Sequence, residues 1–151
     1  MEEVLRMFNE KRIRYLLIGG QAMRLSGMPR FSMDWDLYIP ARDKGNLARI
    51  NELLGREIDV PVEALGERGE NFIQTYQTRW GVIQFHLGGP GLPPFDEAEK
   101  RCVDRFDVNG AKIRCLSERD LLASKEAAGR AQDLTDAEFL RKKIGTHTDK
   151  A

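Results

Sequence analysis

Short apolar runs alternate with amphipathic stretches along the first third of the chain. Val4, Leu5 and Phe8 recur at helical spacing and predict a helix over residues 2–12. The nearly continuous apolar run at 14–18 is typical of a buried central strand, and it stops at Gly19 and Gly20. The same patterns predict a helix at 21–25, a strand at 31–39 ended by Pro40, and an amphipathic helix at 43–54 closed by Gly55.

Strands and helices follow one another irregularly in the remainder of the chain. Alternation at 57–65 hints at an edge strand, although Pro61 argues against a central one. The other predicted elements are strands at 72–79 and 82–87, a glycine- and proline-rich loop at 88–94, a helix at 95–103, a hairpin at 106–115 with Asn-Gly at its turn, a helix capped by Ser117, and a helix at 135–144. This order favours an α+β fold, a mixed β-sheet with flanking helices, over a doubly wound parallel sheet.

Composition narrows the class of protein without naming a function. The 151 residues are 41% hydrophobic and 32% charged, which suits one soluble globular domain. Lys+Arg and Asp+Glu both number 24, so no overall field attracts nucleic acid or an anionic membrane. Cys102 and Cys115 lack metal-site spacing and are expected to be free thiols. With no signal-peptide pattern and no membrane-length apolar run, we expect a cytoplasmic protein with no membrane partner.

Two carboxylates interrupt the apolar run SMDWDLYIP. Asp34 and Asp36 lie two residues apart, so on a strand both would point to one face, and they repel each other unless a cation lies between them. Mg²⁺ suits that position because it is held by one or two carboxylates together with substrate phosphates. An isolated pair is weak evidence, since chance alone gives about four such acid-x-acid pairs in a chain of this composition. Solvent-facing acids are the alternative.

The pair Gly19 and Gly20 strengthens the metal hypothesis. Glycines between a buried strand and a helix let the backbone approach a phosphate, although a tight turn explains them as well. The order strand, Gly-Gly, short helix, turn, strand with two acids would bring a phosphate cradle beside a metal pair. That layout suits transfer of a nucleotidyl group from a triphosphate.

The stretch GGQAMRLSGMPRFSMDWDLYI resembles the opening of nucleotidyltransferases of the polymerase-β superfamily. More narrowly, it is similar to the small bacterial group related to the AbiEii toxins of type IV toxin–antitoxin systems. The group's pattern Arg-x-Thr/Ser-x-Asp-x-Asp is matched in register by Arg30, Ser32, Asp34 and Asp36. Residues 125–136, KEAAGRAQDLTD, resemble its second signature, so the resemblance runs from about residue 10 to residue 145.

The resemblance implies a role for each matched residue. It implies a single nucleotidyltransferase domain over 1–151, with the helices from about residue 117 completing the nucleotide site. Gly19 and Gly20 would bind the triphosphate, Asp34 and Asp36 would hold Mg²⁺ or Mn²⁺, Lys125 would contact nucleotide phosphate, and Arg30, Ser32, Arg130, Asp133 and Asp136 would complete the nucleotide site.

Spacing gives independent support for the second signature. Lys125, Gly129 and Asp133 would share one face of a helix, with Gly129 leaving room between a cation and a carboxylate. The alternative is a solvated helix surface with an ordinary ion pair.

The chain departs from the superfamily at the third carboxylate, which often deprotonates the attacking hydroxyl. Gln84 and His86 stand on the strand where an acid is expected. Gln84 takes no proton, whereas His86 has a side chain that can act as a base or ligand near neutral pH. A partly buried His86 bonded to a neighbour is the favoured alternative, and Asp59 and Glu63 are other sources of a carboxylate.

These observations lead to a main hypothesis and two rivals. The main hypothesis is an enzyme that binds a metal-bound NTP and transfers a nucleotidyl group to a hydroxyl on RNA, protein or a small molecule, as in a toxin–antitoxin toxin, with an antitoxin or a second copy as partner. The first rival is a catalytically degenerate nucleotide-binding or interaction module. The second is a structural domain whose acids are surface residues.

Overall fold

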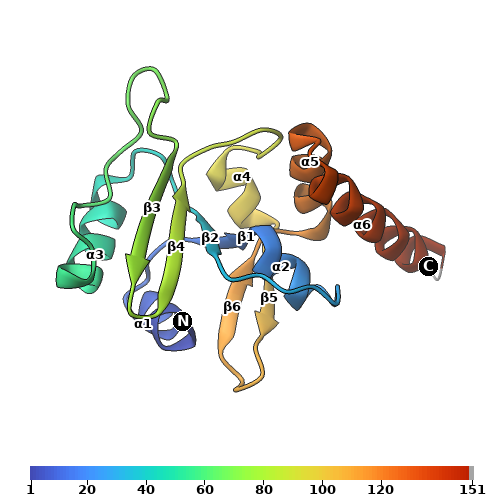
Figure 1. The fold of residues 1–151 in the computed structure, drawn as a ribbon, viewed down its shortest axis with the longest axis horizontal. Helices are drawn as coiled ribbons and strands as arrows, with labels where there is room; N and C mark the ends of the chain where they lie inside the picture. Colours follow the sequence, from blue (N-terminus) through green and yellow to red (C-terminus); the bar gives the residue numbers. More distant parts are fainter. Residues whose placement is uncertain (150–151) are drawn as a thin grey trace.

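The computed structural model describes residues 1–149, and in it six strands form one mixed sheet (Figure 1). The strands are β1 (Leu16–Ile18), β2 (Trp35–Tyr38), β3 (Ile73–Thr78), β4 (Gly81–His86), β5 (Val103–Phe106) and β6 (Lys112–Cys115), in the spatial order β3-β4-β2-β1-β6-β5. β2 pairs antiparallel with β1 and parallel with β4, and β1 pairs parallel with β6. The expected α+β class, a mixed sheet with flanking helices, is confirmed.

Six α-helices surround this sheet. They are α1 (Glu2–Glu10), α2 (Gly19–Leu25), α3 (Lys44–Leu54), α4 (Phe95–Lys100), α5 (Glu118–Ala128) and α6 (Ala131–Asp149). The side chain of the N-cap residue itself caps α3 and α5, because Asp43 accepts a hydrogen bond from the Asn46 amide and Ser117 accepts one from the Asp120 amide. Helix α3 lies at one end of the molecule and the packed pair α5 and α6 at the other (Figure 1).

The core lies around the central strands. All three residues of β1 are buried, as the continuous apolar run predicted, and Leu37, Ile83 and Phe85 are fully buried on β2 and β4. Cys102 and Cys115 are free thiols, and burial raises the pKa of Cys115 to about 12. None of the helices that the structure describes combines the length and apolar character needed to cross a bilayer.

The strand predicted at 31–39 is shorter than expected. Residues 31–34 precede β2 in irregular conformation, so Asp34 lies just outside the strand that carries Asp36. This segment has no neighbouring strand to pair with, and side chains hold it in place instead. Gln21 donates a hydrogen bond to the Ser32 carbonyl at 2.6 Å, and Arg30 binds Asp136 of α6. The prediction of two carboxylates on one strand was therefore wrong, although both side chains reach the same cleft.

Several other boundaries differ from the sequence prediction. Residues 57–65 form no strand, because the Asn51 side chain hydrogen-bonds the amide and carbonyl of Val62 where a strand partner would. Helix α4 ends at Lys100, since Val103 already belongs to β5. The hairpin begins at that earlier strand, and its Asn-Gly pair lies in a longer loop in which Asp107 and Ala111 are hydrogen-bonded.

Residues 125–136 do not form one continuous helix. Helix α5 ends at Gly129, whose left-handed φ of 66° reverses the chain, and α6 begins at Ala131, before the predicted Thr135. Asp133 accepts a hydrogen bond from the Arg130 amide, which caps the start of α6. The expectation that Lys125, Gly129 and Asp133 share one helical face was thus wrong, and Gly129 serves as a corner between two helices.

Candidate functional site

A cleft of about 580 Å³ lies between the sheet and the helical pair α5 and α6. Six of the ten residues singled out in the sequence line it: Gly19, Asp34, Asp36, Lys125, Arg130 and Asp133. The other four, Gly20, Arg30, Ser32 and Asp136, do not line the cleft, and their contacts support residues that do. Chain segments about ninety residues apart in sequence therefore meet at one site.

Gly19 and Gly20 interlock with the aspartate segment. Ile18 is the ladder partner of Asp36, so Gly19 follows directly beside the Asp36 carboxylate. A Cβ on Gly19 would collide with Oδ2 of Asp36, and one on Gly20 would lie 2.6 Å from Oγ of Ser32. Gly19 also has a φ of 71°, which L side chains rarely adopt. The two glycines are thus required by packing against the aspartate segment itself.

Asp36 is paired with His86 across two parallel strands. Nε2 of His86 lies 2.8 Å from Oδ1 of Asp36, and both side chains are mostly buried. Gln84, the ladder partner of Asp36, also faces the cleft. The two oxygens of Asp36 therefore have different neighbours: Oδ1 is bonded to His86, and Oδ2 lies beside Gly19. His86 thus is a strand residue bonded to a neighbour, and that neighbour is the central candidate carboxylate.

Lys125 lies in a buried network of ion pairs. Its Nζ lies 3.0 Å from Oδ2 of Asp136 and 3.4 Å from Oδ1 of Asp133, and only 8% of the residue is exposed. Asp136 is fully buried and also accepts hydrogen bonds from Arg30 and Gln132. Every formal charge in this network has an opposite partner, as burial requires. Arg30 therefore joins the aspartate segment to α6 and does not reach into the cleft.

Arg130 extends from the corner between α5 and α6 into the cleft. Its Nε donates to Oδ2 of Asp133 at 2.8 Å, yet 82% of its side chain is exposed. Burial would raise the pKa of Asp133, but the hydrogen bonds from Arg130 and the nearby Lys125 charge outweigh it, so the pKa is lowered. The Asp133 bond raises the pKa of Arg130, and Asp36 across the cleft adds to this effect. Arg130 is thus a cation that Asp133 holds in place and whose side chain remains exposed to the cleft.

The donor set of the cleft fits Mg²⁺. Asp34 and Asp36 supply carboxylate oxygens, and a hard cation of this kind takes one or two carboxylates and completes its shell with water and phosphate oxygens. Within the described part of the chain, no three His, Cys, Asp or Glu side chains are grouped to hold a metal by themselves.

Sequence reasoning missed the apolar side of the cleft. Phe72, Ile73, Pro90 and Leu92 line it, as does Ser124 of α5. Gln84 and His86 were found because they lie on the strand where the superfamily often has a third carboxylate, and there they alternate with buried Ile83 and Phe85. Nothing comparable marks Phe72 and Ile73, since an apolar pair at the start of a strand usually belongs to the core.

Comparisons with known proteins locate the fold. No protein-family model matches the chain, and no curated protein matches it in sequence. Among solved structures it is similar to the lincomycin-bound lincosamide antibiotic adenylyltransferase LnuA, with 18% identity and a TM-score of 0.58 over 92% of both chains.

A second solved relative has the same architecture. It is the antibiotic-resistance factor ANT(2'')-Ia, solved in solution and as a crystal complex with adenylyl-2''-tobramycin. Identities are 17% and 18% and TM-scores 0.60 and 0.59, over 96% of this chain and 82% and 87% of those chains. The chain has a nucleotidyltransferase fold. The narrower similarity to the AbiEii-related group remains a prediction.

Proposed function

We propose that this protein is a nucleotidyltransferase that binds a metal-bound NTP and transfers its nucleotidyl group to a hydroxyl. The observation that carries this proposal is that Asp34 and Asp36 line one cleft together with Lys125 and Arg130. Carboxylates for a metal and cations for phosphates are the groups that this chemistry requires. The likeness in fold to two antibiotic nucleotidyltransferases supports it.

Each residue has a distinct role in this proposal. Lys125 and Arg130 bind the β- and γ-phosphates, and Gly19 allows the triphosphate to approach the backbone beside Asp36. Asp34 and Asp36 would hold Mg²⁺, which when bound neutralises phosphate charge and polarises the α-phosphorus. Asp133 and Asp136 hold Lys125 and Arg130 in place, and α5 and α6 thereby complete the nucleotide site. Gly20, Ser32 and Arg30 position the aspartate segment.

The reaction proposed is an in-line displacement. The acceptor oxygen forms a bond to the α-phosphorus, and the bond to the oxygen that bridges to the β-phosphate breaks. Pyrophosphate leaves with that electron pair, and the hydroxyl loses its proton. His86 is the side chain of the cleft best suited to receive the proton, since it lies beside Asp36 where the superfamily often has a third carboxylate.

A second candidate function follows from the same position. Gln84 faces Asp36 in the strand register and cannot act as a base. A protein that binds NTP without transferring it would tolerate this residue. Turnover, and not binding, distinguishes the two candidates.

Calorimetry with each NTP in the presence of Mg²⁺ tests the proposal. We expect metal-dependent binding by the wild type and its loss in the double variant Asp34→Ala/Asp36→Ala. Asp104→Ala, an exposed acid on the edge strand β5, is the matched control and should bind as the wild type does. Absence of metal-dependent binding in the wild type would refute the proposal, whereas binding without pyrophosphate release across a broad acceptor panel would favour the second candidate.

The toxin hypothesis is tested separately. If the protein is a toxin, induced expression should arrest growth, and the arrest should require Asp36. Co-expression of an antitoxin should relieve it. Normal growth during expression of active protein would leave a small-molecule acceptor as the proposed substrate, in line with the lincomycin and tobramycin named for the solved relatives.

A further inference from the structure

Four apolar side chains, at the start of β3 and in the 88–94 loop, line the same cleft as Lys125 and Arg130. They are Phe72, Ile73, Pro90 and Leu92, which we name the apolar shelf. Phe72, which precedes the edge strand β3, and Ile73, which begins it, remain 39% and 42% exposed. Large apolar side chains held open inside a polar cleft gain free energy when a ligand covers them. The apolar shelf is therefore a surface prepared for a ligand group.

The order of the strands places the β3 end of this shelf, Phe72 and Ile73, where an acceptor must enter. Gly19 follows β1, and β4 and β3 lie on the other side of β2 in the order β3-β4-β2-β1. If the triphosphate lies along Gly19, Lys125 and Arg130, the pyrophosphate leaves on that side. An in-line displacement brings the attacking oxygen from the opposite side, which is the side of β4 and β3.

The shelf is anchored to the helix that carries Lys125. Gly91 lies so close to α5 that an added Cβ would be 2.5 Å from the Ala123 carbonyl oxygen and 2.7 Å from Cβ of Ala127. The Tyr38 hydroxyl donates to the Pro93 carbonyl at 2.7 Å and fixes the other end of the loop. The 88–94 loop is thus docked on α5, and Pro90 and Leu92 hold a defined position relative to the cation side.

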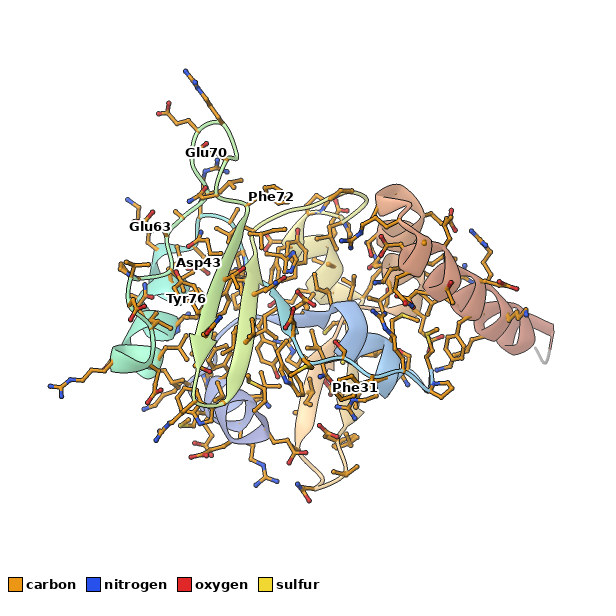
Figure 2. All side chains as sticks on the ribbon, in the orientation of Figure 1. Phe31, Asp43, Glu63, Glu70, Phe72 and Tyr76 are labelled. Carbon is orange, nitrogen blue, oxygen red and sulfur yellow. The ribbon has the colours of Figure 1, made fainter. Side chains whose placement is uncertain are left out.

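The charges on this side disfavour a polyanionic acceptor. Among the described residues that line the cleft, the part formed by β3, β4 and the 88–94 loop contributes Gln84 and His86 and no Lys or Arg. The neighbouring segment 63–72 carries Glu63, Glu67 and Glu70 against Arg68 alone. Phe72, Glu63 and Glu70 lie toward the same end of the molecule (Figure 2). An RNA acceptor would need cations along its phosphates, and this side of the cleft lacks them.

We propose that the apolar shelf binds the acceptor, and that the acceptor is an uncharged or cationic small molecule with a hydroxyl group beside an apolar face. This inference rests on the proposed function and deepens it. The acceptor oxygen forms a bond to the α-phosphorus, pyrophosphate leaves with the electrons of the broken P–O bond, and the hydroxyl proton passes to His86. Gln84 and His86 provide polar contacts beside the shelf.

Ligand-observed saturation-transfer NMR tests this inference without requiring turnover. The protein is loaded with Mg²⁺ and the non-hydrolysable analogue AMPCPP, and p-nitrophenyl glucoside, lincomycin and tobramycin are offered in turn. We expect at least one of the three to bind the wild type. Phe72→Ala should weaken that binding on the order of tenfold. Phe106→Ala removes an exposed phenylalanine on β5, at the opposite edge of the sheet, and should leave binding unchanged.

The affinity for AMPCPP, measured by calorimetry on the same samples, separates the two proposals. Unchanged AMPCPP binding in Phe72→Ala, with weakened small-molecule binding, supports the inference. Binding of none of the three compounds by AMPCPP-loaded wild type would overturn it, and so would equal binding by Phe72→Ala. A loss of AMPCPP affinity in Phe72→Ala would also overturn it, since the shelf would then hold the base. Failure of the wild type to bind any of the four NTPs with Mg²⁺ would instead refute the proposed function.

Discussion

The cation side of the cleft is held by ion pairs, whereas the apolar shelf in the same cleft leaves large side chains open to solvent. Lys125, Asp133 and Asp136 are buried and mutually paired, and Arg30 ties them to the aspartate segment. Phe72 and Ile73 have no such fixed partners and remain two-fifths exposed. The difference indicates where precision is needed. A triphosphate needs fixed charges at fixed positions, whereas an apolar face is recognised by area and shape.

The largest expected effect comes from the carboxylate between the two sides. Asp36→Asn keeps the shape of the side chain and removes its negative charge, so the site would lose one of the two carboxylates proposed to hold the metal. We expect transferase activity to fall by about a thousandfold, because each 1.4 kcal/mol of lost charge stabilisation is about tenfold in rate. A steady-state assay of pyrophosphate release measures it. Asp104→Asn serves as the control, and equal activity of the two variants would show that Asp36 does not take part.

The cation side should also matter for stability. Lys125→Met leaves Asp133 and the fully buried Asp136 with one cation fewer, which costs on the order of 3–5 kcal/mol for a buried pair. Chemical denaturation should detect this loss, together with weaker NTP binding. Lys112→Met, at an exposed position of β6, should change neither quantity. A stable Lys125→Met protein with weak NTP binding would mean that Lys125 acts on the ligand alone.

Gly19→Ala tests the packing within the first signature, between Gly19 and Asp36. The substitution adds a strained backbone, at about 1–2 kcal/mol, and a collision with Asp36. Gly27 is the matched control, because its φ of 103° is also positive but nothing lies within 4 Å of an added Cβ. Gly19→Ala should therefore destabilise the protein more than Gly27→Ala in a thermal unfolding experiment. Equal losses of stability in the two variants would show that the Asp36 side chain moves aside at no cost in stability.

The smallest effect concerns acid pH. The folded pKa of Asp133 is lowered, so its contribution to stability is present above the unfolded value near ~3.9 and is lost as the pH falls through the folded pKa. Asp133→Asn should lack this contribution. A fall of a few degrees in the wild-type Tm below about pH 4, reduced in Asp133→Asn, is expected. The apolar shelf has no group of this kind, so Phe72→Ala should keep the wild-type acid profile.

The sequence predicted the local parts of this site better than the distant ones. Hydrophobic periodicity and caps found β1, α3 and α5, because those signals are carried by neighbouring residues. The Asp34 and Asp36 motif was visible for the same reason. The irregular conformation of residues 31–34 was not, since it depends on Gln21 and on Asp136 more than a hundred residues away.

The helical corner and the shelf show the same limit. Gly129 fitted a helical pattern on either side of it, but it ends α5 in a left-handed conformation that lets α6 fold back onto α5. The exposure of Phe72 and Ile73 could not be predicted, because it depends on which neighbours cover them, and spacing along one strand carries no information about that. An ion pair of Lys125 along one helix was the alternative considered from the sequence, but its ion pairs are formed between two helices.

The central claim is that the Asp34 and Asp36 pair and the cation side of the cleft hold one metal-bound triphosphate. A crystal structure with Mg²⁺ and AMPCPP tests it most directly. We predict the metal between the carboxylates of Asp34 and Asp36, with the triphosphate running past Gly19 to Lys125 and Arg130 and the apolar shelf left free. A nucleotide bound elsewhere, or one with its base on Phe72 and its phosphates away from Lys125, would contradict the account.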